Sequence, residues 1–209
     1  MNPEINLEDM KAYFEQTLEA HGATPRGVDW NSEASQELRF DQLAKLLEPK
    51  NWFSIIDYGC GYGALVNYLI DKGFTFQYTG YDFLESMVDK ARKLFQNRPD
   101  TTFIWRASDL EIADYCVASG IFNLKLEAKS ETWTEYVLGV LNHMNQLSAK
   151  GLAFNMLTKY SDADRMRPDL YYADPCYYFD YCKTHFARNV ALLHDYGAYD
   201  FTIIVRKQV

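Results

Sequence analysis

The sequence predicts one α/β domain built on a single doubly wound sheet, mostly parallel, with an antiparallel hairpin strand at its C-terminal end. Three observations support this fold class. From residue 52 to residue 157, short apolar runs alternate with helical stretches, a pattern typical of βαβ units and a parallel sheet. The last two apolar runs are joined by residues 194–200 alone, too few for a crossover helix, so they should pair as a hairpin. The hydrophobic share of 48% is sufficient for a buried core.

The N-terminal part is expected to form a helical cap over residues 1–50, and residues 51–209 form the sheet domain. Asn6 and Asp9 suit the start of the first helix, and Gly22 stops it. In chain order, the predicted elements are a helix over 10–18, a second helix from Asn31 or Ser32 to Pro49, strands at 52–56, 76–81, 102–105, 115–119 and 152–157, helices at 64–70, 84–96 and 133–147, and hairpin strands at 190–193 and 201–205.

Charge and composition narrow the class of protein. The formal net charge is −8, which gives no counterion-release gain on a polyphosphate and disfavours a nucleic-acid binder. The apolar content is too high for a disordered chain. The aromatic share of 16% is unusual and includes 16 tyrosines. A soluble enzyme or binding domain with a small-molecule partner therefore remains.

The sequence predicts a cytoplasmic protein with no membrane association. The N-terminal residues carry acidic side chains and no apolar core of a signal peptide. No apolar run is long enough to cross a bilayer. The four cysteines have no metal-ligand spacing, so we expect reduced thiols and no metal site.

A glycine-rich loop joins the first predicted strand to the next helix. It reads Asp57-Tyr58-Gly59-Cys60-Gly61-Tyr62-Gly63, and such a unit places a nucleotide-type ligand over the helix N-terminus. The third glycine comes one residue too early for the dinucleotide fingerprint. The Asp57 carboxylate would also repel a pyrophosphate, by about 4 kcal/mol at an effective dielectric near 20. These departures disfavour a dinucleotide-dependent oxidoreductase and favour a ligand with an adenosine end and a cationic end, as in S-adenosylmethionine.

With these residues the chain resembles the class I S-adenosylmethionine-dependent methyltransferases of the small-molecule type, over roughly residues 52–206. Four motifs occur in the family's order: the acid and glycines of the loop, an acid after the second strand, Ser-Asp-Leu after the third, and the loop 119–123 after the fourth. The resemblance implies a Rossmann-like fold, with S-adenosyl-L-methionine as cofactor and S-adenosyl-L-homocysteine as product. The cofactor-binding residues that it implies are Asp57, Gly59, Cys60, Gly61, Gly63, Asp82, Phe83, Met87, Ser108, Asp109, Leu110 and Ser119.

The resemblance also assigns roles to individual residues. Asp82 stands 19 residues past Gly63, the spacing of a ribose-binding acid. Asp109 would accept from the adenine amine, and Arg39 in the second helix would hold the cofactor's carboxylate. Each residue has a structural alternative: Asp57 as a helix cap, Asp82 as a turn residue, Asp109 in a solvated loop, Phe83 and Met87 as core, and Arg39 on the surface.

The methyl acceptor is expected to lie under a lid formed by residues 158–186, a long segment after the fifth strand. This segment is rich in tyrosine, with arginines interleaved. The candidate acceptor-binding residues are Trp30, Tyr171, Tyr172, Arg165 and Arg167. In the alternative interpretation, Tyr177, Tyr181 and Cys182 form a helical face that packs on the sheet.

Methyl transfer is an in-line displacement, so a general base is needed only for a protonated acceptor. The candidate catalytic residues are His194, Tyr160 and Asn123, while His143 is interpreted as a boundary residue of its helix. O-methylation is slightly favoured. N-methylation of a small amine and a non-catalytic S-adenosylmethionine-binding module stay open as alternatives.

Overall fold

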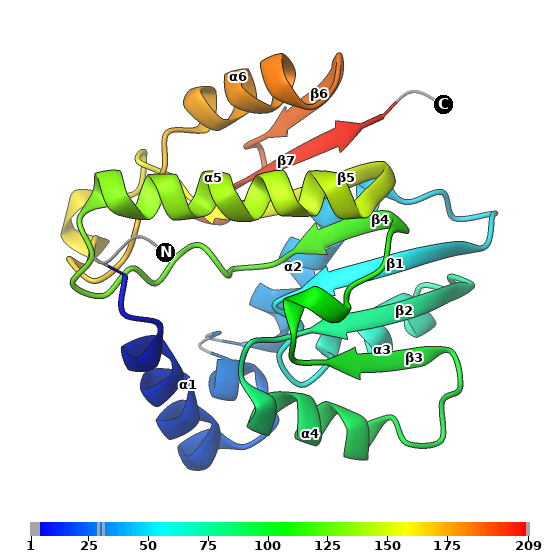
Figure 1. The fold of residues 1–209 in the computed structure, drawn as a ribbon. Helices are drawn as coiled ribbons and strands as arrows, with labels where there is room; N and C mark the ends of the chain where they lie inside the picture. Colours follow the sequence, from blue (N-terminus) through cyan, green and yellow to red (C-terminus); the bar gives the residue numbers. More distant parts are fainter. Residues whose placement is uncertain (1–4, 29, 31, 208–209) are drawn as a thin grey trace.

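The structure is a computed structural model that describes residues 5–28, 30 and 32–207. Within these residues, seven strands form one sheet in the order β3-β2-β1-β4-β5-β7-β6 (Figure 1). The strands are β1 (Phe53–Tyr58), β2 (Phe76–Tyr81), β3 (Thr101–Ile104), β4 (Ala113–Ala118), β5 (Ser148–Leu157), β6 (Asn189–Leu193) and β7 (Asp200–Arg206). Strand order reverses at β1, and such switch points in open α/β sheets create ligand crevices.

The sheet is parallel from β3 to β5 and becomes antiparallel at β7. Strand β7 lies between β5 and β6 and runs antiparallel to both. The predicted hairpin is therefore confirmed. The connection is too short to cross the sheet, so the second strand of the hairpin returns beside the first and inserts next to β5.

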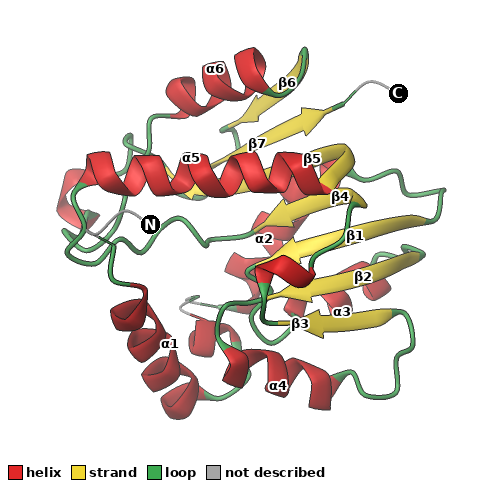
Figure 2. Ribbon diagram, in the orientation of Figure 1, coloured by secondary structure: helices red, strands yellow, loops and turns green. Residues whose placement is uncertain are grey.

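Helices cover the sheet from both sides (Figure 2). One face packs against α2 (Glu33–Leu43), α3 (Ala64–Asp71) and α4 (Glu85–Leu94), and the other against α5 (Ser130–Leu147) and α6 (Pro175–His185). This two-sided cover, with the strand order, is the predicted Rossmann-like arrangement. Among the described residues, no helix is both long and apolar enough to span a bilayer.

The N-terminal elements follow their local signals closely. Helix α1 (Leu7–His21) begins at Asn6, whose side chain accepts from the Glu8 backbone N–H, and ends at Gly22 with φ +67°. Helix α2 is capped by Ser32, while Asn31 lies outside the described residues. A short 3-10 turn continues the second helix to Leu46. In Figure 1, α1 lies beyond the arrowheads of β1, β2 and β3, at the carboxyl ends of the parallel strands.

One crossover lacks a full helix. Strand β3 connects to β4 through the 3-10 turn Ala107–Asp109. The side of β2 that faces away from α3 and α4 is consequently only half-buried, at Gln77, Thr79 and Tyr81. This explains the alternation of apolar and polar residues in a strand that would otherwise be apolar throughout.

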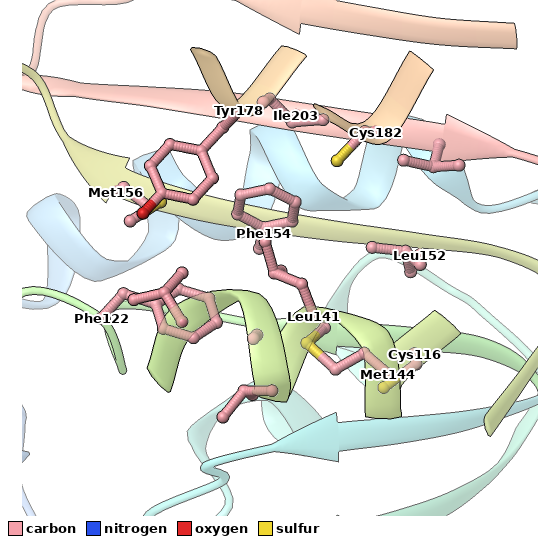
Figure 3. Packing of buried hydrophobic residues seen from close by; sticks show 14 of the residues in the cluster. Cys116, Phe122, Leu141, Met144, Leu152, Phe154, Met156, Tyr178, Cys182 and Ile203 are labelled. Carbon is pink, nitrogen blue, oxygen red and sulfur yellow. The ribbon is translucent and has the colours of Figure 1, made fainter. Parts of the chain in front are cut away.

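The core between β5, α5 and α6 shows where much of the aromatic content is buried. Phe154 of β5 lies between Leu141 of α5 and Ile203 of β7, and Tyr178 and Cys182 of α6 close the layer (Figure 3). All five side chains are fully buried. Helix α6 therefore packs on the sheet, as one interpretation of this segment predicted, but through Tyr178 and Cys182 and not through Tyr177, which is 46% exposed.

Candidate functional site

A cavity of about 290 Å³ lies at the carboxyl ends of β1, β2 and β4. Its floor is the glycine loop, its roof comes from the N-terminal elements, and one wall comes from α5. Its lining residues are Leu7, Met10, Phe14, Val28, Trp30, Gln36, Phe40, Asp57, Tyr58, Gly59, Cys60, Gly61, Tyr62, Ala64, Tyr81, Asp82, Phe83, Leu84, Met87, Ser119, Gly120, Ile121, Tyr136 and Val140. The lining is mostly apolar with few polar groups, which is typical of a small-molecule site.

Asp82 ties the end of β2 to the glycine loop. Its carboxylate accepts the Gly61 N–H at 2.9 Å and the Leu84 N–H at 3.0 Å. Burial raises the pKa of the Asp82 carboxyl to about 6, and the two backbone hydrogen bonds oppose this rise. Gly61 has φ +54°, and a Cβ there would lie 2.9 Å from Val28, so the loop needs glycine at this position.

Asp57 lies beneath the loop at the end of β1. Its carboxylate accepts the Tyr78 hydroxyl at 2.7 Å. Burial raises the pKa of Asp57 to about 7, the Tyr78 hydrogen bond lowers it, and the neighbouring Asp82 raises it further. No described residue forms an ion pair with Asp57 or Asp82. Two buried carboxyl groups on one cavity therefore create a site that a cation would stabilise.

The roof of the cavity comes from α1, Trp30 and α2. Leu7, Met10 and Phe14 of α1 line it, and Leu18 of the same helix packs on Leu84 and Met87. Trp30 closes a second side, so near to the loop after β4 that a Cβ on Gly120 would meet its ring at 2.4 Å. This roof covers one side of the cavity.

The wall toward α5 is formed by three tyrosines and a valine. We call it the tyrosine wall: Tyr58 of β1, Tyr81 of β2, and Tyr136 and Val140 of α5. The Tyr58 and Tyr81 rings meet edge to face, with centroids 4.8 Å apart. The Tyr58 hydroxyl lies 3.2 Å from Nδ1 of His143, one turn further along α5. The wall lies on the sheet face over which the crossover after β3 places only a 3-10 turn.

Most of the predicted cofactor-binding residues meet at this cavity. The lining includes Asp57, Gly59, Cys60, Gly61, Asp82, Phe83, Met87 and Ser119, together with Trp30. Gly63 lies behind them as the left-handed residue that starts α3. Parallel strands end at one edge of the sheet, so residues from three motifs far apart in the chain come together there.

Other predicted cofactor ligands lie elsewhere. Ser108 and Asp109 are exposed in the 3-10 turn after β3 and bond to each other, and Leu110 packs on the core beside α5. Arg39 is buried and paired with Asp200 of β7, and its guanidinium stacks 4.4 Å from the Trp30 ring. Arg39 therefore supports the roof through Trp30, and its side chain is not part of the cavity lining.

The predicted catalytic residues also lie away from the cavity. Tyr160 and His194 pack against each other with ring centroids 5.9 Å apart, both exposed, beside the β6–β7 hairpin. The Asn123 side chain accepts the Leu157 N–H at 3.0 Å and holds the loop after β4 to the end of β5. None of these three residues lines the cavity.

The proposed lid segment has a structural role in this fold. No described residue between 158 and 186 lines the cavity. Tyr171 is buried, and its hydroxyl lies 2.7 Å from Thr134 Oγ1 and 3.0 Å from the Tyr178 hydroxyl. The Tyr172 hydroxyl accepts the Arg167 N–H at 2.9 Å. Arg165 and Arg167 are exposed, and Arg167 pairs with Asp169. Helix α1 takes the place over the cavity that this segment was predicted to occupy.

The tyrosine wall was missed in the sequence. Tyr58 and Tyr81 end the first two strands directly beside the predicted motifs, so their position was a usable signal. Tyr136 shares the apolar face of α5 and is indistinguishable there from a core residue. The apolar face of α1 likewise predicted packing, without revealing that it packs over a cavity.

Comparisons with known proteins agree with this geometry. Residues 55–147 match a family model described as a methyltransferase domain. The chain is 52% identical over 155 residues to Rv1506c of Mycobacterium tuberculosis (strain ATCC 25618 / H37Rv), whose name describes a methyltransferase; the match covers 74% of this chain and 93% of that protein.

Solved structures share the fold at low sequence identity. Magnesium protoporphyrin IX methyltransferase from Synechocystis PCC 6803, with bound SAM, aligns with a TM-score of 0.68 at 16% identity, over 99% of this chain and 100% of that chain. The DhpI–SAH complex aligns with a TM-score of 0.64 at 11% identity, over 96% of each chain. The small RNA methyltransferase HEN1 aligns with a TM-score of 0.59 at 15% identity, over 84% of this chain and 25% of that one.

Proposed function

Because this chain belongs to the class I S-adenosylmethionine-dependent methyltransferases, we propose that it transfers the methyl group to a hydroxyl of a small molecule bound in the roofed cavity. The cofactor supplies an electrophilic methyl group on a positively charged sulfur. The observation that carries the proposal is the roof: α1 and Trp30 lie over the cavity, and a covered cavity suits a small-molecule acceptor better than a polymer, which needs an open groove.

The residues of the cavity fit this cofactor. Each Asp82 oxygen accepts one backbone N–H and has a lone pair left for a ribose hydroxyl. Asp57 and Asp82 are buried without a described cationic partner, and a cationic ligand would favour their ionised forms. Phe83 and Met87 offer apolar surface to the adenine ring. In this proposal, Asp82 holds the ribose and Asp57 contributes negative potential near the cationic end.

The chain itself would contribute positioning and water exclusion to the reaction. The buried apolar lining lowers the local dielectric, and the roof keeps water from the reacting groups. The net charge of −8 supports a small neutral or cationic acceptor over a nucleic acid. The phenol groups of the cavity wall can both donate and accept hydrogen bonds, which suits an acceptor hydroxyl.

The proposal is tested by measuring S-adenosyl-L-homocysteine production with a panel of acceptors. The panel contains hydroxyaromatics, aliphatic alcohols, small amines, carboxylic acids and a short RNA duplex. We expect turnover with members of the hydroxyl classes and none with the RNA. Turnover with amines alone would replace O-methylation by N-methylation, and turnover with RNA alone would exclude a small-molecule acceptor.

A further inference from the structure

We propose that Tyr58 and His143 form the proton-accepting pair of the reaction, and that the tyrosine wall binds a flat acceptor with a phenolic hydroxyl. The inference rests on the proposed function and deepens it by naming the acceptor class and the path of the proton. His143 would act through Tyr58, so it is a positioning and relay residue, while Tyr58 contacts the acceptor.

The geometry places a base directly behind the cavity wall. The Tyr58 hydroxyl lies 3.2 Å from His143 Nδ1, and the two rings are perpendicular with centroids 5.8 Å apart. Tyr136, Val140 and His143 are spaced four and three residues apart on α5 and so share one helical face. The first two line the cavity, and the third is reached from it through Tyr58.

The chemistry of the wall explains why a relay is needed. Burial raises the pKa of Tyr58, and the neighbouring Tyr81, Tyr136 and Cys116 raise it further. Burial likewise raises the pKa of Tyr81 to about 12 and that of Tyr136. These phenols therefore stay protonated near neutral pH and do not act as bases alone. Tyr58 can accept a proton only while it gives its own proton to a partner, and His143 is placed to receive it.

The proton transfer and the methyl transfer balance in one step. The acceptor's hydroxyl proton passes to the Tyr58 oxygen while the Tyr58 proton passes to Nδ1 of His143. The acceptor oxygen forms a bond to the methyl carbon as the carbon–sulfur bond breaks, and the electron pair of that bond stays on sulfur. His143 is half-exposed, so the resulting imidazolium can return the proton to water.

The wall also selects the shape of the acceptor. The three tyrosine rings and Val140 form a mainly apolar surface. The side chains of these four residues carry hydroxyl groups but no charged group. Aromatic rings favour edge-to-face and offset contacts with another ring, as Tyr58 and Tyr81 already make with each other. A flat hydroxyaromatic acceptor satisfies both the surface and the proton path, whereas an anionic acceptor would meet no positive charge in this wall.

The pair is tested first without turnover, using 7-hydroxycoumarin as the probe and protein loaded with S-adenosyl-L-homocysteine. The excitation spectrum of this probe distinguishes its phenol from its phenolate. The proteins compared are the wild type, Tyr58→Phe and His143→Gln, with His185→Gln as the matched control. His185 is exposed on α6 and stacks on Tyr181. We expect the wild type and the control to lower the apparent pKa of the bound probe by about one unit or more, and both pair variants to lose this shift.

Cofactor affinity and turnover then separate the possible roles. Calorimetry should show S-adenosyl-L-homocysteine affinity within about twofold of wild type in both variants. With a hydroxyl acceptor identified by the panel, kcat should fall about 100-fold in both variants while KM for S-adenosyl-L-methionine is unchanged, the usual effect of general base loss. The deficit should shrink at high pH, where the acceptor ionises without help.

Three results would overturn the inference. They are failure of the probe to bind the loaded wild type, equal probe ionisation in all variants, and a tenfold loss of S-adenosyl-L-homocysteine affinity in Tyr58→Phe, which would assign the wall to the cofactor. The proposed function fails in a different way, through absence of turnover of any hydroxyl acceptor by the wild type.

Discussion

The two acidic residues of the cavity, Asp57 and Asp82, show how burial changes the pKa of a carboxyl group and makes its ionisation depend on a bound ligand. Asp57 is the fifth residue of β1, and Asp82 follows β2 directly. Asp57 is buried beneath the glycine loop and Asp82 is bonded to that loop, and burial raises both pKa values. At the residue scale, burial therefore disfavours the ionised forms of both carboxyl groups, and a bound cation would favour them.

Replacing Asp82 should remove most of the cofactor affinity. We expect Asp82→Asn to weaken S-adenosyl-L-homocysteine binding about 10- to 100-fold, because a hydrogen bond to a charged group contributes about 1.5–3 kcal/mol. Calorimetry measures the change, with Asp109→Asn as the control, since Asp109 is exposed outside the cavity. Equal affinity in Asp82→Asn and wild type would contradict the ribose-binding role.

Asp57 should make the ligand-free protein less stable as the pH rises. Its pKa is about 7 when folded, against an ordinary value of 3.8, so the folded state holds a proton that the unfolded chain has released in this interval. Its stabilising contribution is therefore full below the unfolded pKa and is lost as the pH rises to about 7. Between about pH 5.5 and 7 the loss is on the order of 2 kcal/mol.

Urea unfolding at about pH 5.5 and pH 8 measures this effect. Asp57→Asn keeps an acceptor for the Tyr78 hydroxyl and removes the titrating group, so its stability should change less between the two pH values. If the variant and the wild type lose equal stability, Asp57 is not the group responsible.

At the scale of elements, α1 is the helix whose role changed most between sequence and structure. Its apolar face predicted a cap, and the structure shows that this face forms the roof of the cavity. The segment 158–186, predicted as the lid from its tyrosines, packs instead on α5 and the sheet through Tyr171 and Tyr178. An amphipathic pattern predicts that one face of a helix is buried, but it does not predict which element or cavity that face covers.

The roof should contribute to binding more than to folding. We expect Phe14→Ala to weaken S-adenosyl-L-homocysteine binding about tenfold, since it removes apolar surface from the cavity. Glu15→Ala, on the exposed side of the same helix, should bind normally. Calorimetry gives the affinities and thermal unfolding checks the fold. A Phe14→Ala protein with normal affinity would show that α1 does not cover the bound ligand.

At the scale of the whole molecule, one buried ion pair joins the two ends of the chain. Arg39 of α2 pairs with Asp200 at the start of β7, and neither side chain is more than 9% exposed. The guanidinium also binds the Ser35 carbonyl at 2.6 Å and stacks on Trp30. The contacts of Arg39 thereby link α2, Trp30 of the roof and the C-terminal hairpin.

Breaking that pair from one side should destabilise the whole fold. We expect Arg39→Met to lower the free energy of unfolding by about 3–5 kcal/mol, because Asp200 would remain buried and unpaired. Urea unfolding measures this loss. The double variant Arg39→Met/Asp200→Asn should recover part of it. A stable Arg39→Met protein with weakened S-adenosyl-L-methionine binding would instead support a direct contact of Arg39 with the cofactor.

The sequence alone determined the order of elements, the parallel sheet with its hairpin, and the glycine loop with its two acids. These features depend on local periodicity, turn residues and strand ends, which are encoded within short stretches of the chain. The tertiary structure decided what covers the cavity and what forms its wall. Tyr58, Tyr136 and Phe14 all line this cavity. The short β3–β4 crossover leaves one sheet face without a full helix, and α1 packs over the strand ends. Both outcomes depend on contacts between segments that are far apart in the chain.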